Sequence, residues 1–370
     1  MKVQFDTEGP RRRLGQIRTE IDKIDEEILS LLFRRQSAAI QAGLVKQVLG
    51  MDTLDQKRER QVLTRLSAGG NTTLAPGSIR SIFAQIMTAS RSVQTATAVA
   101  YLGPQGTFTH QAAEKYFGGH SAYRSMDTLE EVFASIANGL CGMGVVPLEN
   151  SSEGAVRETL DLFNRTNLKI HGEVFLKIEH HLLSRAPGIS AVNRVYSHPM
   201  ALAQCSGWIR ENLCHVECLE ASSTARAVSL AFQNPAAAAV GSGFAGHLHS
   251  LPVLARGIEN RKDNRTRFAV LGDAPCPAPT GRDRTSLLVH LDHRPGALCS
   301  ALDPLAENGI NLTRIDSHPS GTRPWEYMFF LDLEGHAKDE AMSQAIGTLA
   351  SRCSHVKTLG SYPRGDELWT

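Results

Sequence analysis

The chain has 370 residues and a mass of 40.3 kDa, which is too long for one ordinary hydrophobic core and predicts two or three domains. Lys and Arg total 39 and Asp and Glu total 38, so the formal net charge of +1 gives no electrostatic reason to expect a nucleic-acid or membrane partner. The sequence contains no bilayer-length apolar run, no signal-peptide core and no CxxC pair among its seven cysteines. We therefore expect a cytoplasmic protein with reduced thiols, no metal site and no cofactor.

Residues 11 to 94 are predicted to be entirely helical. A first helix continues beyond Lys46 and would run about 35 residues, or roughly 50 Å. The shorter helices that follow, at about residues 54–66 and from Ser78 onward, are too short to cover it, so its apolar stripe predicts a partner chain and an intertwined dimer. The stripe has the spacing of an amphipathic helix and consists of Leu14, Ile17, Ile21, Ile24, Ile28 and Leu31.

Polar side chains are placed on these helices in a pattern that suits an anion. At about 100° per residue, Arg35 and Lys46 share one face of the first helix, whereas Arg18 points elsewhere and could serve a site on the partner chain. Taken singly, each polar residue could belong to a solvated charged face; on a buried face, each would need a partner such as a ligand. The candidate residues of this segment are Arg18, Arg35, Lys46, Asp55, Arg58, Glu59, Ser90 and Gln94.

This set resembles the site of the all-helical chorismate mutase domain, with every position filled. The resemblance covers nearly all of residues 11 to 94 and implies a unimolecular rearrangement of chorismate to prephenate, without nucleophile or general base. Arginine forks would bind the substrate carboxylates. Lys46 and Gln94 would donate to the breaking ether oxygen, and Glu59 would orient the substrate hydroxyl.

From Val99 the pattern changes to short apolar runs, each followed by small polar residues and a helical segment. This alternation predicts a mostly parallel sheet with crossover helices. The Pro-rich stretch at 273–283 is expected to be a linker. The predicted strands are residues 99–102, 143–148, 194–197, 216–219 and 238–241.

Four loops of small polar residues follow strands and open helices. Helix amino termini bind anions and gather at the carboxyl ends of parallel strands, although each loop alone could be a simple helix cap. The sequence contains neither GxxxxGK[ST] nor a proper GxGxxG, which disfavours a nucleotide. The loops are GPQGTF (103–108), PLENSSEG (147–154), SHPMALAQC (197–205) and SSTARA (222–227).

Together with NRTRF (264–268), these loops occur in the order found in prephenate dehydratases, a resemblance that covers residues 98–272. It implies two α/β lobes similar to a periplasmic binding protein, with prephenate between them converted to phenylpyruvate, carbon dioxide and water. Thr266 would be a positioned hydrogen-bond donor, and position 200 is Met200 where many relatives have Gln. The implied catalytic residues are Asn150, Ser197, Gln204 and Thr266, and the implied substrate-binding residues are Thr107, Ser222, Ser223, Thr224, Arg267 and Phe268.

The segment after the linker reads βαββαβ, a ferredoxin-like order. It resembles an ACT domain, and the resemblance implies L-phenylalanine as an effector. The family signature ESRP appears as DSHP, so a largely neutral histidine replaces a fixed cation, which predicts inhibition that is weakened or more pH-dependent. The implied regulatory residues are Gly296, Ala297, Leu298, Asn311, Leu312, Asp316, Ser317, His318 and Pro319.

We therefore predict a multidomain protein: an all-α mutase domain at 1–97, a two-lobed α/β dehydratase domain at 98–275 and an ACT domain at 284–370. It would act on chorismate and prephenate, respond to L-phenylalanine and form a homodimer or higher homo-oligomer. Two alternatives stay open. One is a dehydratase of the same family that prefers arogenate; the other is a non-catalytic amino-acid-binding regulator, which would be expected to lack Thr266 or the helical cations.

Overall fold

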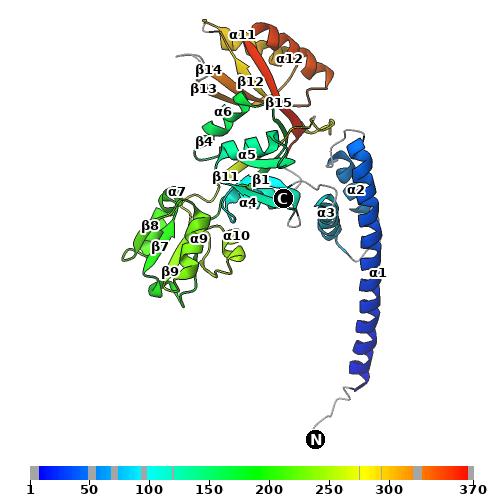
Figure 1. Ribbon diagram of the computed structural model, residues 1–370, viewed down its shortest axis with the longest axis vertical. Helices are drawn as coiled ribbons and strands as arrows, with labels where there is room; N and C mark the ends of the chain where they lie inside the picture. The colour runs from blue at the N-terminus through cyan, green and yellow to red at the C-terminus, as the bar shows by residue number, and fades with distance from the viewer. Residues whose placement is uncertain are drawn as a thin grey trace. The chain divides into compact units, whose positions relative to one another are not determined.

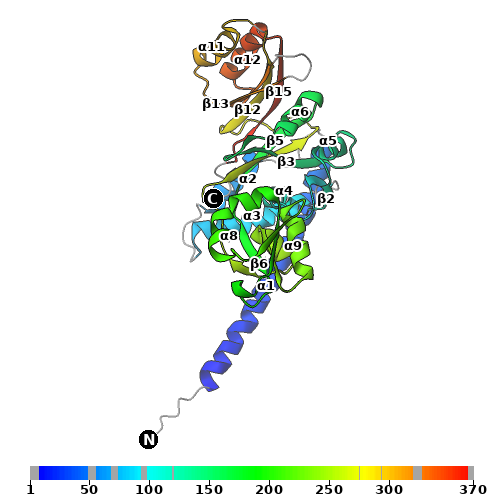
Figure 2. The ribbon, with the colours of Figure 1, turned by 90° about the vertical axis from the view of Figure 1, so that its left-hand side faces the viewer.

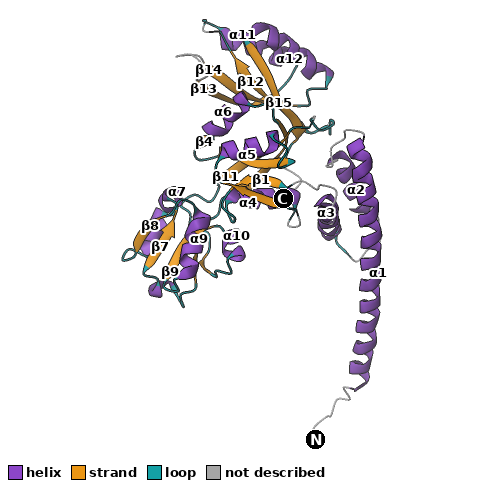
Figure 3. Cartoon of the chain, viewed as in Figure 1, coloured by secondary structure: helices purple, strands orange, loops and turns teal. Residues whose placement is uncertain are grey.

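The structure is a computed structural model that divides into two compact units. One is built from the amino-terminal helices, and the other contains all the described strands (Figure 3). None of the helices in the described ranges combines the length and apolarity that a membrane span requires. The structure describes residues 8–48, 56–67, 74–92, 98–118, 121–274, 276–292, 294–319 and 327–365.

The helical unit is dominated by α1 (Glu8–Val48), whose 41 residues exceed the expected length (Figures 1 and 2). It is followed by α2 (Gln56–Ser67) and α3 (Pro76–Ser92). Helix α3 begins two residues before Ser78, the cap that we expected. The reason is that proline suits the first helical turn, where its fixed φ is helical and its missing N–H is not needed. The apolar stripe from Leu14 to Leu31 on α1 is 47–59% exposed.

The first lobe of the second unit is a mixed sheet in the order β2-β1-β3-β11-β5, with β4 paired to β3. Only the pairs of β1 with β2 and β3 are parallel. Its strands are β1 (Val99–Leu102), β2 (Tyr123–Met126), β3 (Met143–Asn150), β4 (Gly154–Ala155), β5 (Lys169–Lys177) and β11 (Arg265–Gly272). Its helices are α4 (Phe108–Phe117), α5 (Leu129–Ala137) and α6 (Arg157–Arg165).

The second lobe has the sheet order β10-β6-β9-β7-β8. Strand β7 is parallel to its neighbours β8 and β9, whereas β6 is antiparallel to its neighbours β9 and β10. Its strands are β6 (His181–Ser184), β7 (Arg194–Ser197), β8 (Glu217–Glu220), β9 (Ala237–Gly241) and β10 (Val253–Ala255). Its helical segments are a 3₁₀ turn (Ile189–Ala191), α7 (Pro199–Gln204), α8 (Ser206–Asn212), α9 (Thr224–Gln233) and α10 (Gly243–Leu248).

The expectation of a mostly parallel sheet is therefore wrong, because both sheets are mixed. The chain leaves the first lobe through β5, which leads directly into β6, and returns through β11. The returning strand β11 inserts antiparallel between β3 and β5. Strands that cross between lobes do not need the crossover helices on which our alternating pattern was based, and for that reason the pattern missed them.

The last segment has the expected βαββαβ order and forms an antiparallel sheet, β13-β14-β12-β15, with α11 and α12 packed on it. Residues of this sheet, among them Met328, Phe330 and Leu359, also share one hydrophobic cluster with the first lobe. The sheet is thus covered by its own helices on one side and by the first lobe on the other. The elements are β12 (Asp283–His290), α11 (Ala297–Glu307), β13 (Leu312–Pro319), β14 (Tyr327–Glu334), α12 (Glu340–Arg352) and β15 (His355–Pro363).

Candidate active site and effector site

The centre of the dehydratase site is a side-chain pair on two neighbouring strands. Thr266 on β11 lies directly opposite Asn150 on β3, and Asn150 Nδ2 donates to Thr266 Oγ1 at 2.8 Å and to Asn264 Oδ1 at 2.9 Å. The backbone N–H of Ser152 donates to Asn150 Oδ1 at 2.9 Å, so both ends of this amide are fixed. Because Thr266 Oγ1 accepts this bond, its own hydroxyl hydrogen is left to donate to a ligand.

A second polar chain crosses from the first lobe to the second. Gln204, at the end of α7, donates through Nε2 to Glu153 Oε1 at 3.2 Å, and its Oε1 lies 3.1 Å from His180 Nε2. The backbone N–H of His180 donates to Glu259 Oε2 at 2.9 Å. Burial lowers the pKa of His180, which favours the neutral imidazole. Burial alone would raise the pKa of Glu259, but hydrogen bonding from His180 N–H and the cation of Lys262 lower it, so this carboxylate is charged.

The amino termini of three helices meet where the lobes adjoin. Thr107 caps α4, Ser223 caps α9 and Ser242 caps α10, each accepting a backbone N–H from the first turn. A Cβ at Gly106 would lie 3.4 Å from Ala245 Cβ and 3.5 Å from Ala225 Cβ, which places the loop before α4 against the first turns of the other two helices. Free N–H groups at such termini favour a bound carboxylate. Thr224 is the first residue of α9, and Ser222 is exposed beside it.

Three of the predicted substrate residues do not contact the Asn150–Thr266 pair through their side chains in any of the hydrogen bonds between described residues. Ser197 is fully buried, and its Oγ donates to the Val240 carbonyl at 2.7 Å, so it holds β7 to the neighbouring β9. Arg267 points from β11 toward the ACT sheet, where its Nη2 donates to Tyr362 Oη at 3.0 Å. Phe268 is 1% exposed. Adjacent residues of a strand point to opposite faces, so Arg267 cannot share the face of Thr266.

His180, Glu259 and Asn264 were not among the predicted site residues. Asn264 stands two residues before Thr266 and could have been found from its place in NRTRF, because asparagine at a strand start often fixes the local backbone. Histidine at position 180 carried no spacing signal. Its contact with Gln204 joins residues 24 positions apart and depends on the tertiary fold.

In the helical unit, the structure brings Arg35 and Ser90 together. Arg35 Nη1 donates to Ser90 Oγ and, at 3.4 Å, to the Ile86 carbonyl, while Ser90 Oγ donates to Gln36 Oε1 at 3.1 Å. Ser90 is 4% exposed. Arg18 and Arg58 are exposed, whereas Lys46 and Glu59 are half-buried. Two further predicted positions, Asp55 and Gln94, lie outside the described residues.

The predicted effector residues of the ACT domain lie on α11 and on the edge strand β13. Gly296 begins α11 in a left-handed conformation, φ +76°, which glycine adopts without strain; Ala297 behind it is buried and Leu298 is exposed. Asn311 Nδ2 donates to Glu334 Oε2 at 3.1 Å, just before the half-buried Leu312 that starts β13.

Within DSHP the side chains alternate, so the four residues do not form one surface. Ser317 and Pro319 are exposed. Asp316 and His318 point the other way, toward the first lobe. There Asp316 Oδ2 lies 2.5 Å from Arg314 Nε, and His318 Nε2 lies 2.9 Å from Asp161 Oδ1 on α6.

Comparison with known proteins defines the class first. Residues 17–95 match the family model of chorismate mutase type II, residues 99–276 that of prephenate dehydratase and residues 285–350 that of the ACT domain. The chain is thus a multidomain enzyme in which a mutase, a dehydratase and a regulatory-type domain follow one another.

Full-length relatives define the family. The chain is 41% identical over 357 residues to the bifunctional chorismate mutase/prephenate dehydratase of Aquifex aeolicus, covering 95% of this chain and 98% of the relative. It is 38% identical to that of Pseudomonas aeruginosa, again over 95% and 98%. A solved prephenate dehydratase from Arthrobacter aurescens in complex with L-Phe is 32% identical, with a TM-score of 0.67, over 73% of this chain and 91% of that one. The chain belongs to the bifunctional chorismate mutase/prephenate dehydratases.

Proposed function

We propose that prephenate binds between the two α/β lobes, against Thr266 and Asn150, and that Thr266 donates a hydrogen bond to the departing ring hydroxyl. The observation that carries this proposal is the fixed amide of Asn150, which occupies the acceptor side of Thr266 Oγ1 and turns its hydrogen outward. Loss of carbon dioxide supplies the electron pair that makes the ring aromatic as hydroxide leaves. The enzyme therefore has to stabilise the leaving oxygen and position the substrate. Helix amino termini at Thr107 and Ser223 support binding of the two carboxylates.

We further propose that the mutase site is built around Arg35, with Ser90 fixing its guanidinium, and that it is completed in a homodimer. The apolar stripe of α1 supports a dimer because its six residues are about half exposed in the single chain. Arg18 is exposed 17 positions before Arg35, about 25 Å away along the helix axis, which is too far to serve the same pocket. It suits a pocket of the partner chain.

We infer that L-phenylalanine binds the ACT domain and inhibits the dehydratase. The structure of a prephenate dehydratase in complex with L-Phe, from a relative 32% identical to this chain, supports L-phenylalanine as a ligand. His318 Nε2 lies 2.9 Å from Asp161 Oδ1 on α6, so this histidine joins the ACT domain to the first lobe. We expect the half-inhibiting L-phenylalanine concentration to differ between pH 6 and pH 8 in the parent, and to be the same at both in His318→Arg. Equal inhibition of the parent at both pH values would refute the role of His318.

Two variants test the separation of the two sites. Arg35→Ala should abolish chorismate consumption while leaving dehydration of supplied prephenate intact; Arg34→Ala, an exposed neighbour on α1, is the matched control. Thr266→Val keeps the side-chain shape but removes the hydroxyl, and should lower dehydratase kcat by about 10²–10³-fold with mutase activity unchanged. Loss of both activities from either variant, with the protein folded, would contradict the two-site proposal.

A further inference from the structure

Strands β3 and β11 carry two cross-strand pairs side by side. Thr266 lies opposite Asn150, and at the next position Arg267 lies opposite Glu149. Because adjacent strand residues point to opposite faces, the first pair faces the proposed substrate site and the second faces the ACT sheet. Any shift of the second pair along or across the strands is therefore felt by the first.

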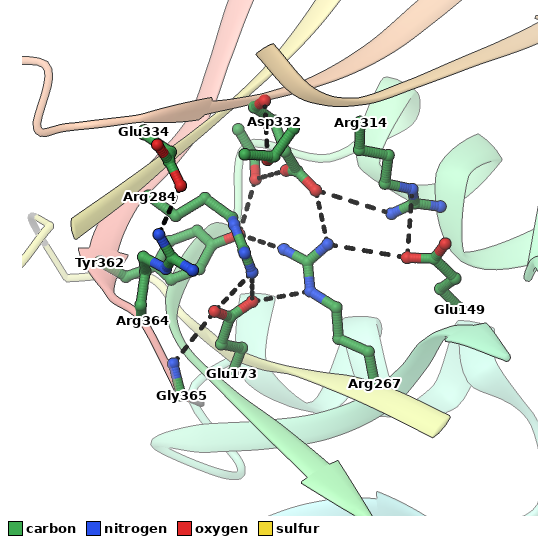
Figure 4. Close-up of polar contacts among 12 residues, drawn as sticks. Glu149, Glu173, Arg267, Arg284, Arg314, Asp332, Glu334, Tyr362, Arg364 and Gly365 are labelled. Carbon is green, nitrogen blue, oxygen red and sulfur yellow. Dashed lines mark hydrogen bonds and ion pairs between the residues drawn. The ribbon is translucent and has the colours of Figure 1, made fainter. Parts of the chain in front are cut away.

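Arg267 is the centre of an ionic cluster between the first lobe and the ACT domain (Figure 4). Its Nε donates to Glu173 Oε2 at 2.7 Å, its Nη1 donates to Asp332 Oδ2, and Glu149 Oε2 lies 3.8 Å from Nη1. Burial alone would lower the pKa of Arg267 and raise that of Asp332; their pairing reverses both directions, so both are charged. The cluster joins three cations to four anions: Arg267, Arg284, Arg314, Glu149, Glu173, Asp316 and Asp332.

Arg314 on β13 connects this cluster to the DSHP segment. Its Nε lies 3.3 Å from Glu149 Oε2 and 2.5 Å from Asp316 Oδ2, and its guanidinium stands 4.9 Å over the ring of Phe330. The side chain is 8% exposed, yet none of its three nitrogens makes a well-directed hydrogen bond to the described residues. Its Nη1 also lies 3.9 Å from Asp332 Oδ2. The guanidinium is held by charge and by the ring, so its distance from Glu149 is set by where β13 lies.

We propose that the Arg314–Glu149 contact is the link through which strand β13 of the ACT domain sets the position of Asn150 and Thr266. Glu149 is then a positioning residue of the dehydratase, adjacent to Asn150 and outside the substrate pocket. Movement of β13 carries Arg314, together with its strand neighbour Asp316, toward or away from Glu149, and the fixed or freed Glu149 shifts the β3–β11 pair. The regulatory side of this inference rests on the proposed response to L-phenylalanine; the positioning side does not.

The test is a double-mutant cycle on the full chain without effector. Glu149→Gln and Arg314→Gln should each lower dehydratase kcat by about 10-fold or more, because small displacements of catalytic groups are costly, while KM for prephenate stays within about twofold. The double variant should be no slower than either single variant. Arg314→Lys should retain the parent kcat, since the contact depends on charge. Thermal unfolding of the full chain reports whether the unit with the dehydratase lobes and the ACT domain is folded. Glu217→Gln, at an exposed ion pair with Arg194, is the matched control.

The proposed Arg314–Glu149 link would be refuted if Arg314→Gln kept the parent kcat. It would also be refuted if the fold-reduction in kcat of the double variant equalled the product of the two single reductions. Arg314 is buried, so Glu149→Gln, whose side chain is 36% exposed, decides the question if the Arg314 variant does not fold. With saturating L-phenylalanine, the fold-inhibition of Glu149→Gln should be at least about fivefold smaller than that of the parent. A parent that does not respond to L-phenylalanine would refute the effector proposal alone, because the kcat cycle is measured without it.

Discussion

Replacing Glu173 by glutamine should strongly destabilise the unit that contains the dehydratase lobes and the ACT domain. Glu173 is 2% exposed on β5, and its carboxylate accepts from Arg267 Nε at 2.7 Å, from Arg284 Nη1 at 2.6 Å and from the backbone N–H of Gly365 at 3.1 Å. Glutamine has the same volume, so no cavity forms. The change removes one of the four negative charges of the cluster and leaves two buried guanidinium groups without their shared anion.

Removing one partner of a buried ion pair costs about 3–5 kcal/mol in unfolding free energy. For a unit of this size, such a loss corresponds to a fall in Tm on the order of 10 °C. Scanning calorimetry of Glu173→Gln and of Glu217→Gln checks this, since the second variant makes the same chemical change at an exposed pair, which is worth at most about 1 kcal/mol. A Glu173→Gln transition within about 2 °C of the parent would refute our assignment of Glu173 and its two arginines as a buried, charged group.

Three further outcomes follow from buried groups elsewhere in this unit. Because burial lowers the pKa of His180, the imidazole takes up a proton at higher pH in the unfolded chain than in the folded one. The free energy of unfolding should therefore be highest above about pH 6.5 and should fall as the pH drops toward the folded pKa. Measured by urea unfolding between pH 7.5 and 5.5, this fall should be smaller in His180→Gln than in the parent. Gly360→Ala should cost about 1–3 kcal/mol in urea unfolding, because its Cβ would come within 2.2 Å of the Ile170 carbonyl oxygen where β15 crosses β5; an unchanged midpoint would contradict that close approach. Leu160→Ala, at 1% exposure in the cluster shared by the first lobe and the ACT sheet, should cost about 2–5 kcal/mol, and a loss below 1 kcal/mol would argue against a shared core.

Motif order and local periodicity in the sequence were sufficient for the three-part architecture. The spacing of Leu14 to Leu31 predicted a long amphipathic helix, and two strands, Val99–Leu102 and Arg194–Ser197, agree with their predicted ranges. The βαββαβ order of the last segment is also confirmed. These features depend on near neighbours in the chain, on which side-chain periodicity and turn chemistry act directly.

Motif membership gave less reliable information about where each side chain points. Thr266, Arg267 and Phe268 stand together in TRF, yet only Thr266 bonds to Asn150; Arg267 binds the ACT sheet and Phe268 is buried. Likewise, DSHP reads as one effector surface, whereas His318 contacts Asp161 of the first lobe. Strand alternation separates such neighbours, and their faces are known only once the sheet is placed.

The sequence by itself determined part of the secondary structure and which chemical groups are available: the helical stripe, the polar loops, the TRF threonine and the βαββαβ order. Only the tertiary structure decided which of those groups meet. Asn150 and Thr266 are 116 positions apart, and Glu173 reaches Arg284 across 111. The physical reason is that a hydrogen bond or ion pair between distant segments depends on strand register and on which sheet faces pack together, and neither is encoded in the pattern around any single residue.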